Sequence, residues 1–289
     1  MRSISIDSPA KLNLHLKVLG RCPDGYHELF TLFHRISLKD RITIKKVAKP
    51  GFSLTTNHPQ LRRSNQNLIY SAYQALRNVK HWQGGVQVKL DKKIPLAAGL
   101  GGGSSDAAHF LLAMNRLFKL KLSRKILVKL GAKLGADVPF FLYGVNQAMG
   151  TGKGEKIRPL KCQNKLWFAV LVPPFKLSTA LVYRRLKAPP LTRITRDATI
   201  TSAFFRDVKK GAWKDILHND LFRASCALRP ELSKMEMLFD RVSAANYLMS
   251  GSGSSMFSVH HSKIEAERVA RRIRRLVVSR ARVFVCHTY

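Results

Sequence analysis

PLAAGLGGGSSD, residues 95–106, is the stretch that decides the fold of this chain. Four of the five residues from 99 to 103 are glycine, two serines follow, and an amphipathic helical pattern begins directly behind them. Glycine lets the backbone adopt positive φ and approach a ligand closely. The N–H groups of such a loop, together with the positive end of the following helix, form a site suited to a di- or triphosphate. We therefore interpret the stretch as a phosphate-binding loop.

A tight turn before a helix is the plainer alternative, with Ser104 and Ser105 as N-caps. We favour the phosphate loop because a turn needs one or two glycines and not four. The stretch is not a Walker A motif, since no Gly-Lys-Ser/Thr follows, and it does not match G-x-G-x-x-G, whose last position falls on Ser104. The two commonest nucleotide-binding folds are excluded by this spacing.

Elsewhere the hydrophobic pattern predicts strands and helices in mixed order. Residues 11–18 alternate strictly, which indicates a half-buried strand with Leu12, Leu14 and Leu16 on its apolar face. Such an order favours an α+β architecture over a doubly wound parallel sheet, with domains over 1–160 and 161–289. Residues 187–210 are expected to be a loop-rich connection with one short helix. Further strands are expected near 41–47, 86–90, 167–172, 256–259 and 283–286, and helices at 67–79, 107–117, 126–134 and 268–277.

The chain is strongly basic, with 51 Lys+Arg against 17 Asp+Glu among 289 residues and a net charge of +34. Such a field attracts nucleic acid, anionic lipid or phosphorylated metabolites, so a basic nucleic-acid-binding protein is a rival hypothesis from a different class. Apolar residues at helical spacing run through the densest basic cluster, which favours a surface helix with a solvated face. That cluster is Arg268, Arg271, Arg272, Arg274, Arg275, Arg280 and Arg282.

The cysteines and the N-terminus indicate a cytoplasmic protein without a membrane anchor. The four cysteines, Cys22, Cys162, Cys226 and Cys286, are far apart and form no C-x-x-C pair, which argues against a zinc site and a disulfide scaffold. The N-terminus lacks a signal pattern, and no apolar run approaches the ~20 residues of a membrane span.

Several single residues carry two interpretations that the residues alone do not decide. Asp137, in GADVPFF, is either a helix N-cap or a carboxylate that accepts a hydroxyl proton. Lys11 is either solvated or, with Asn13 on the same strand face, lines a cleft. Tyr26 and His27 follow an Asp-Gly turn and are either structural or a stacking platform and a reader of a base edge.

A second glycine/serine stretch, SGSGSS at 250–255, stands between two predicted strands. The plain interpretation is a hairpin turn, and the functional one is a loop that closes over phosphates from the other domain.

Five segments in this order resemble the GHMP kinase superfamily: PAKLNL from Pro9, PDGYHEL from Pro23, the glycine-rich loop from Pro95, GADVPFF from Gly135 and MSGSGSS from Met249. They span residues 9–255. The resemblance implies a ribosomal-protein-S5-like N-terminal α/β domain and a ferredoxin-like C-terminal α+β domain, with the active site between them. It implies an ATP-dependent kinase that uses Mg²⁺.

Within the superfamily, the Asp-Gly-Tyr-His segment from Asp24 points to the member that reads cytidine, over mevalonate, homoserine or galactose kinases. The implied substrate is a cytidine diphosphate-linked methylerythritol, phosphorylated at its 2-hydroxyl on a route to isoprenoid precursors. Another small-molecule kinase of the superfamily is the alternative. The expected partners are this small molecule alone, with no membrane, nucleic acid unlikely on these residues, and a monomer or weak homodimer.

The resemblance also implies roles for single residues. Asp137 would be the catalytic base, and Lys11 would stabilise its charged form and the nascent alkoxide. No residue is assigned as a metal ligand. ATP phosphates would be cradled by the loop Pro95, Leu96, Ala97, Ala98, Gly99, Leu100, Gly101, Gly102, Gly103, Ser104 and Ser105, supported by Gly251, Ser252 and Gly253.

For the acceptor substrate, the resemblance implies that Asn13 holds the erythritol hydroxyls and that His27 hydrogen-bonds the edge of cytosine. Tyr26 and Tyr183 would stack on its two faces. One departure stands out, because Phe222 occupies a position where the family often has glutamate, after Asn219-Asp220-Leu221.

Overall fold

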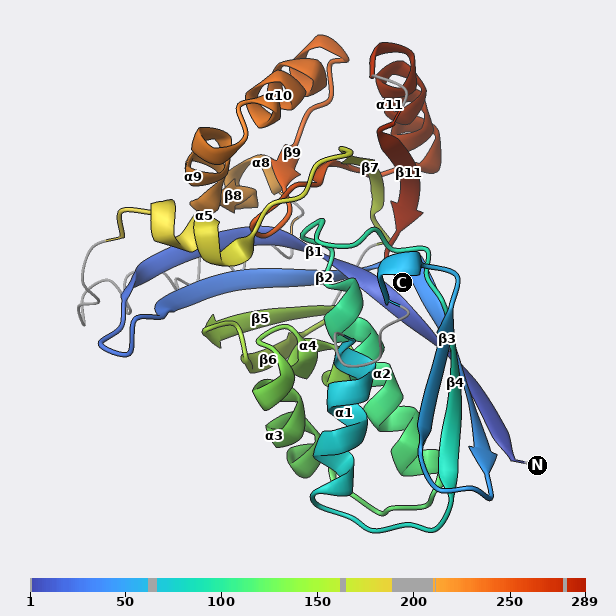
Figure 1. The fold of residues 1–289 in the computed structure, drawn as a ribbon. Coiled ribbons are helices and arrows are strands. Elements are labelled where there is room, and N and C mark those ends of the chain that lie inside the picture. Colours follow the sequence, from blue (N-terminus) through green and yellow to red (C-terminus); the bar gives the residue numbers. More distant parts are fainter. Residues whose placement is uncertain (1, 62–66, 162–164, 189–209, 211, 278–279) are drawn as a thin grey trace. The chain divides into compact units, whose positions relative to one another are not determined.

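The computed structural model describes residues 2–61, 67–161, 165–188, 210, 212–277 and 280–289 (Figure 1). The described chain forms two compact units. Unit 1 comprises Met1–Ala10, Leu38–Pro95 and Gly101–Val145, and unit 2 comprises Lys11–Ser37, Leu96–Leu100 and Asn146–Tyr289. Most of the expected connection at 187–210 lies outside the described residues. The division into 1–160 and 161–289 concerns contiguous halves of the sequence and stays a prediction.

Two long strands, β1 (Ser3–Arg21) and β2 (His27–Val47), each give one end to each unit. In unit 1, β2 pairs antiparallel with β4 (Gly85–Asp91), and β4 pairs parallel with β3 (Phe52–Thr56). Along β4, Val86, Val88 and Leu90 are buried and the residues between them are exposed. The alternation predicted for this strand is therefore confirmed.

Four helices, with the short 3-10 turn η1 (Pro59–Leu61), complete unit 1. Asn67 caps the first of them through its side chain, which accepts from the Ile69 N–H. The serine caps belong to the disfavoured tight-turn interpretation, and the structure contradicts them, because the second helix begins at Gly102 with Gly101 as its N-cap and no side-chain cap. The helices pack against one another (Figure 1) and are α1 (Leu68–Arg77), α2 (Gly102–Leu117), α3 (Arg124–Leu134) and α4 (Val138–Tyr143).

A buried ion cluster joins strand ends of unit 1 to the start of α2. The Lys92 ammonium donates to the carboxylates of Asp40 and, at 2.8 Å, Asp106. Asp40 also accepts the N–H groups of Lys93 and Ile94, at 2.6 and 2.8 Å. Burial raises the pKa of Asp106 to about 7, against the opposing effect of Lys92. Burial opposes charge on Lys92 as well, but Asp106 and Asp40 outweigh it and raise the pKa of that amine.

The cluster fixes where the chain leaves β4 and where α2 begins. We expect Lys92→Met to lower the free energy of unfolding by about 3–5 kcal/mol, because it leaves two carboxylates buried without their cation. Its neighbour is a matched control, since Lys93 is exposed and 3.9 Å from Asp91. Lys93→Met should cost about 0–1 kcal/mol. Urea denaturation measures both, and equal losses would contradict a structural role for the cluster.

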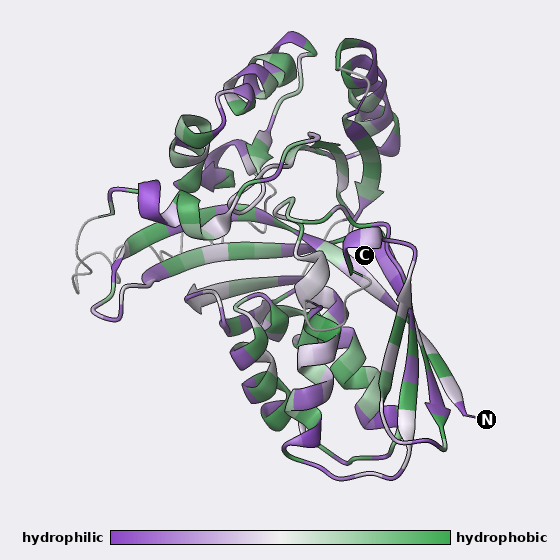
Figure 2. Ribbon diagram, in the orientation of Figure 1, coloured by the Kyte–Doolittle hydropathy of each residue, from purple (hydrophilic) through white to green (hydrophobic). Residues whose placement is uncertain are grey.

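Unit 2 contains a four-stranded antiparallel sheet in the order β11-β7-β10-β9. The sequence predicts its three longer strands, and Val170 of β7 stands opposite both Phe257 of β10 and Phe284 of β11. The arginine-rich helix packs on this sheet through Ala266, Val269, Ala270 and Ile273 and exposes its arginines, as expected (Figure 2). The elements are β7 (Trp167–Val172), β9 (Tyr247–Met249), β10 (Met256–His260), β11 (Arg282–His287) and α11 (Lys263–Leu276).

The N-terminal strands of unit 2 pair with segments from far along the chain. β2 runs antiparallel to β5 (Gln147–Gly152), which pairs with β6 (Lys156–Leu160), and β1 runs parallel to β8 (His218–Asn219). Among the described residues, these strands are accompanied by the helices α5 (Thr179–Arg185), α8 (Trp213–Ile216), α9 (Leu221–Leu228) and α10 (Glu231–Arg241). Two sheets with helices in mixed order confirm the α+β class. Of the described helices, none has the length and apolarity needed to cross a bilayer.

One expectation for β1 is wrong. Its polar face is not solvated, because Lys11 and Asn13 are each 3% exposed and His15 is 9% exposed. The alternation identifies the strand but does not tell which face meets water. Burial of a lysine and an amide requires polar partners, and these partners belong to the candidate site.

Candidate active site

The glycine-rich loop makes a tight path between β4 and α2. Three of its residues have left-handed backbone: Ala97 with φ 52°, Gly99 with φ 75° and Gly101 with φ 66°. Gly103, in the first turn of α2, is exposed. Because the first N–H groups of a helix have no partner inside it, this turn presents donors and the positive end of a 16-residue helix to solvent. The stretch is therefore open and suited to an anion.

The second glycine/serine loop lies directly against residues 98–99 within unit 2. A Cβ placed on Gly99 would be 2.1 Å from the Ser250 carbonyl oxygen. The Ser250 hydroxyl donates to the Gly99 carbonyl at 2.9 Å, and the Ser255 N–H donates to the Ala98 carbonyl at 3.2 Å. The loop does join β9 to β10, as the hairpin interpretation expects. It also holds part of the phosphate loop.

Asn219 holds the second loop, and sequence reasoning missed it. Its amide donates to the carbonyls of Met249 and Gly251, at 2.7 and 2.8 Å. The Ser225 hydroxyl adds a bond to the Ser252 carbonyl at 3.2 Å. The signal in the sequence is the Asn219-Asp220 pair, close to the position where the family often has glutamate. Phe222, at that position, packs half-buried against the core of unit 2.

Lys11 and Asn13 meet the same loop from β1. The Lys11 ammonium donates to the Asn13 side-chain oxygen at 2.5 Å, and the Asn13 amide donates to the Thr31 hydroxyl at 2.8 Å. The Asn13 N–H donates to the Ser250 hydroxyl at 3.2 Å. A Cβ on Gly251 would be 3.1 Å from that Asn13 oxygen and 3.5 Å from the Lys11 ammonium. The structure thus brings together, in unit 2, two predicted strand residues and both glycine loops.

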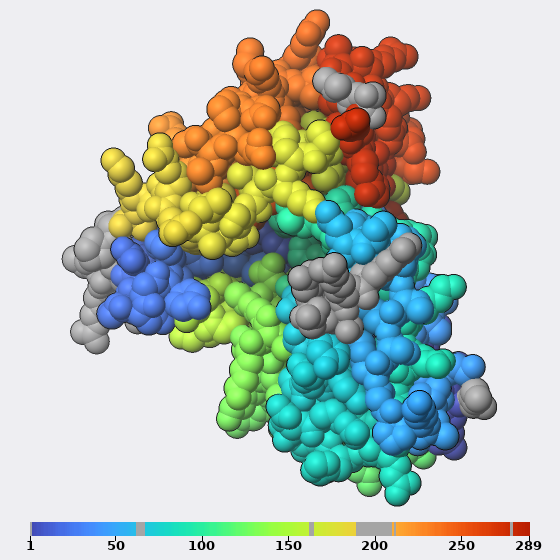
Figure 3. Space-filling view, in the orientation of Figure 1, coloured from blue at the N-terminus to red at the C-terminus, as the bar shows by residue number. Residues whose placement is uncertain are grey.

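Two of the residues expected to contact the cytosine base, Tyr26 and His27, lie where the turn between β1 and β2 ends. The rings of His27 and Tyr183 are 5.2 Å apart, and α5, which carries Tyr183, covers this turn (Figure 3). Burial, and then the charge of Arg21, lower the pKa of His27, which favours a neutral ring at pH 7. Tyr26 is 58% exposed, and the Lys153 ammonium stands 3.4 Å from its ring centroid. His27 and Tyr183 therefore lie together, and Tyr26 is open to solvent.

Asp137 lies in unit 1 at the start of α4. It occupies the N-cap position, but its half-buried side chain makes no capping hydrogen bond. The capping interpretation therefore accounts for its place and not for its carboxylate. The neighbouring Gly135 is close to the first turn of α2, since a Cβ there would be 3.8 Å from the Ser104 hydroxyl.

The two serines of the loop differ. Ser104 is half-buried in the first turn of α2. Ser105 is fully buried, and its hydroxyl donates to the Pro9 carbonyl at 2.6 Å and accepts from Ser8 at 2.9 Å. The Ser105 hydroxyl thus anchors α2 to β1 within unit 1, and Ser104 is the hydroxyl on the ligand side. In the part of the chain that the structure describes, no three His, Cys, Asp or Glu side chains gather as a metal site.

Comparison with known proteins first identifies the class of protein to which the chain belongs. Residues 67–145 match the family model of the GHMP kinases N-terminal domain. Solved structures agree, since mevalonate kinase from Methanococcus jannaschii shares this fold with a TM-score of 0.67 at 16% identity, over 100% of this chain and 99% of that one. The fold is that of a GHMP kinase.

Closer relatives narrow the family. The chain is 37% identical over 270 residues to 4-diphosphocytidyl-2-C-methyl-D-erythritol kinase of Syntrophus aciditrophicus, covering 91% of this chain and 92% of the relative. It is 39% identical to the kinase of that name in Pelotomaculum thermopropionicum, covering 92% of each. A crystal structure of 4-(cytidine 5'-diphospho)-2C-methyl-D-erythritol kinase matches with a TM-score of 0.79 at 34% identity, over 98% of this chain and 99% of that one. The chain belongs to the 4-diphosphocytidyl-2-C-methyl-D-erythritol kinase family.

Contact between the two loops makes Gly99 a sensitive position. We expect Gly99→Ala to lower the free energy of unfolding by about 2–3 kcal/mol, because it adds overlap with Ser250 to left-handed strain. Kinase turnover should fall about a hundredfold through displacement of the loop. Thermal denaturation and a coupled assay of ADP release measure the two effects.

Gly144→Ala is the matched control, since Gly144 has φ 69° and nothing within 4 Å of an added Cβ. It should cost about 1 kcal/mol and leave turnover unchanged. Equal losses of stability and turnover in the two variants would mean that left-handed strain alone explains the effect of Gly99→Ala. The contact with Ser250 would then have no role.

Proposed function

We propose that the chain transfers the γ-phosphoryl group of ATP to the 2-hydroxyl of 4-diphosphocytidyl-2-C-methyl-D-erythritol, on the non-mevalonate route to isoprenoid precursors. Identity of 37% to a kinase of this name over nearly the full length of both chains carries the proposal. The open first turn of α2 supports it, because a phosphate site is what such a reaction requires first. The direct test is ADP release from ATP with the cytidine-linked alcohol. Turnover with a plain alcohol alone, or with neither, would overturn the proposal.

The phosphates of ATP would be held by main-chain N–H groups of the loop from Pro95 to Ser105. Catalysis of phosphoryl transfer depends mainly on charge neutralisation at the phosphates and on positioning of the reacting groups. The loop supplies both without side-chain movement. Lys92, directly after β4, bonds Asp106 behind the loop in unit 1, and Ser250 bonds the Gly99 carbonyl in unit 2. Gly251, Ser252 and Gly253 would support it through the contact at Gly99.

Mg²⁺ is expected with ATP, and the described side chains fit a loosely held ion. This metal keeps several waters and binds mainly to substrate phosphates with one or two protein oxygens. Ser104, half-buried in the first turn of α2, would supply a hydroxyl, and the ion would neutralise charge on the phosphates.

Asp137 would accept the proton of the attacking hydroxyl. A half-buried carboxylate at the start of a helix is a residue type that serves as a general base for a hydroxyl. Lys11 would stabilise the developing alkoxide, and its burial would strengthen this electrostatic interaction because water is excluded around the ammonium. Asn13, which accepts from Lys11, would orient that ammonium and hold erythritol hydroxyls.

The change Asp137→Asn removes the base and keeps the shape. We expect kcat to fall by roughly 10²–10⁴ with the folded state retained. Steady-state kinetics and circular dichroism measure the two. Near-normal turnover would remove Asp137 from the mechanism.

A second variant, Lys11→Met, tests whether both residues serve one step. If they do, the double variant should lose far less than the product of the two single losses. Strictly multiplicative losses would assign Lys11 to another step.

Cytidine recognition would rest on His27, Tyr183 and Tyr26. A neutral His27 ring can pair with the polar edge of cytosine, and Tyr183, packed beside it, can stack on the base. Tyr26 is exposed enough to form the other face. This arrangement would select the cytidine-linked substrate over other alcohols.

We expect Tyr183→Ala to raise KM for the cytidine-linked substrate roughly tenfold to a hundredfold, the scale of one base–aromatic stack. KM for ATP should stay unchanged, and Tyr183→Phe should restore the KM for the first substrate because it keeps the ring. Kinetics with each substrate varied in turn measure this. Equal rises for both substrates would show a general disturbance and not a lost stack.

The remaining expectations concern the surroundings of the enzyme. We propose a cytoplasmic protein with no membrane partner, as a monomer or weak homodimer. The rival reading as a nucleic-acid-binding protein predicts steep salt dependence of RNA binding and no ATP turnover. Membership of the kinase family disfavours that reading as the main function and leaves the high charge unexplained.

A further inference from the structure

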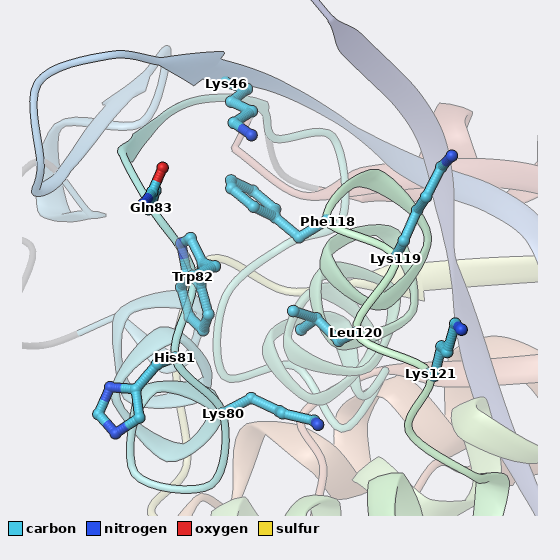
Figure 4. Close-up of a pocket in the computed structure, with 9 residues that line it drawn as sticks. All are labelled: Lys46, Lys80, His81, Trp82, Gln83, Phe118, Lys119, Leu120 and Lys121. Atoms are coloured by element: carbon cyan, nitrogen blue, oxygen red, sulfur yellow. The ribbon is translucent and has the colours of Figure 1, made fainter.

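A pocket lined by lysines lies in unit 1, at the opposite end of α2 from the phosphate loop (Figure 4). Its volume is about 410 Å³, which is within the usual size of small-molecule sites. Residues from the end of β2, the stretch after α1 and the link between α2 and α3 form its walls. We call it the lysine pocket, and the residues that matter are Lys46, Lys80, Trp82, Phe118, Lys119 and Lys121.

The lysine pocket is separate from the kinase site. Helix α2 begins in the glycine-rich loop at Gly102 and ends at Leu117, directly before Phe118 of the pocket. Sixteen helical residues at about 1.5 Å each place the two ends roughly 22 Å apart. A molecule in the pocket would therefore not replace ATP phosphates at the loop.

Positive charge in the pocket is not neutralised by the protein. Lys46, Lys80, Lys119 and Lys121 are all exposed, and no carboxylate lines the pocket. Within the described ranges, none of the four pairs with an acidic side chain. Lysine is a compact charge that binds phosphate well. The charge of the pocket therefore favours an anion with more than one negative charge.

The backbone of the pocket is held in an uncommon conformation. Lys119 and Lys121 have φ 50° and 56°, in the left-handed region that side-chain-bearing residues avoid. Asn115 fixes this link through two hydrogen bonds with the main chain of Leu122, each 3.0 Å. Strain of this kind is found at binding sites, where the surrounding structure maintains it. The two lysines are therefore presented by a rigid link.

An aromatic wall accompanies the charges. The rings of Trp82 and Phe118 are 5.4 Å apart, and both line the pocket (Figure 4). Arg77 holds the Trp82 segment, donating to its carbonyl at 2.8 Å with the guanidinium 4.5 Å from the indole centroid. The Lys46 ammonium stands 5.0 Å from the Phe118 ring centroid. Nucleotide-binding sites combine cationic side chains with aromatic rings, because the cations bind the phosphates and the rings stack on the bases.

We propose that the lysine pocket is a second nucleotide site, in which the lysines bind phosphate and Trp82 or Phe118 stacks on the base. The nucleotide is either free or part of a single strand of nucleic acid. This site is independent of the kinase reaction. Its ligand would bind to part of the large positive charge of the chain.

The test measures binding of three probes to the full-length protein by calorimetry: uridine monophosphate, a six-residue oligouridylate and inorganic pyrophosphate. The pocket variant is Lys80→Gln, Lys119→Gln and Lys121→Gln combined. The control variant is Lys125→Gln, Lys129→Gln and Lys133→Gln, three exposed lysines of α3 in the same unit that do not line the pocket. Both lose the same charge. Trp82→Leu tests the stack.

We expect the pocket variant to weaken nucleotide binding about tenfold or more, and the control variant to change it less than twofold. Trp82→Leu should weaken uridylate binding and leave pyrophosphate binding unchanged. Kinase turnover should be unaffected in every variant, which separates this result from failure of the proposed function. Equal weakening in the two lysine variants, pyrophosphate binding as tightly as the nucleotides, or no binding of any probe would overturn the proposal. Binding of the monophosphate assigns a free nucleotide, and binding of the oligomer alone assigns nucleic acid.

Discussion

A carbonyl oxygen, that of Ser250, stands where a side chain at residue 99 would begin, and the organisation of unit 2 around the phosphate loop depends on this contact. Only glycine allows two backbones to approach so closely. Once they do, Ser250 can bond both the Gly99 carbonyl and the Asn13 N–H. The polar face of β1, the phosphate loop and the second glycine/serine loop are thereby fixed against one another. Residues remote in sequence thus become one polar cluster.

The two buried lysines of the described chain illustrate how differently a cation can be held. Lys92 lies between two carboxylates, which raise its pKa and tie it into the structure. Lys11 donates to a neutral amide oxygen of Asn13 and lies beside Gly251, where bulk is excluded. The Lys11 ammonium thus belongs to the polar cluster of the candidate site. A charge between two carboxylates is already neutralised, and so its role is structural.

The sequence predicts most elements correctly because their signals are local. Alternation at Val86, Val88 and Leu90, the helical spacing within 67–79 and the four glycines of the loop each act within a few residues. It fails where tertiary packing decides. The buried polar face of β1 contacts Ser250, more than 200 residues away in sequence, through the Asn13 N–H. Asn219 was overlooked for the same reason, since its carbonyl partners lie some 30 residues further along the chain.

The pairing of the first strands has a consequence for synthesis of the protein. The strands β1 and β2 are neighbours in one sheet, but β2 meets β5 only at residues 147–152, and the other edge of β1 pairs with residues 218–219. A ribosome adding about 5–20 residues per second leaves the early strand segment waiting roughly ten to forty seconds for its last neighbour. During that time the outer edge of β1 is unpaired and open to association with other chains. Nascent chains of this protein should therefore engage chaperones until the C-terminal third has left the exit tunnel.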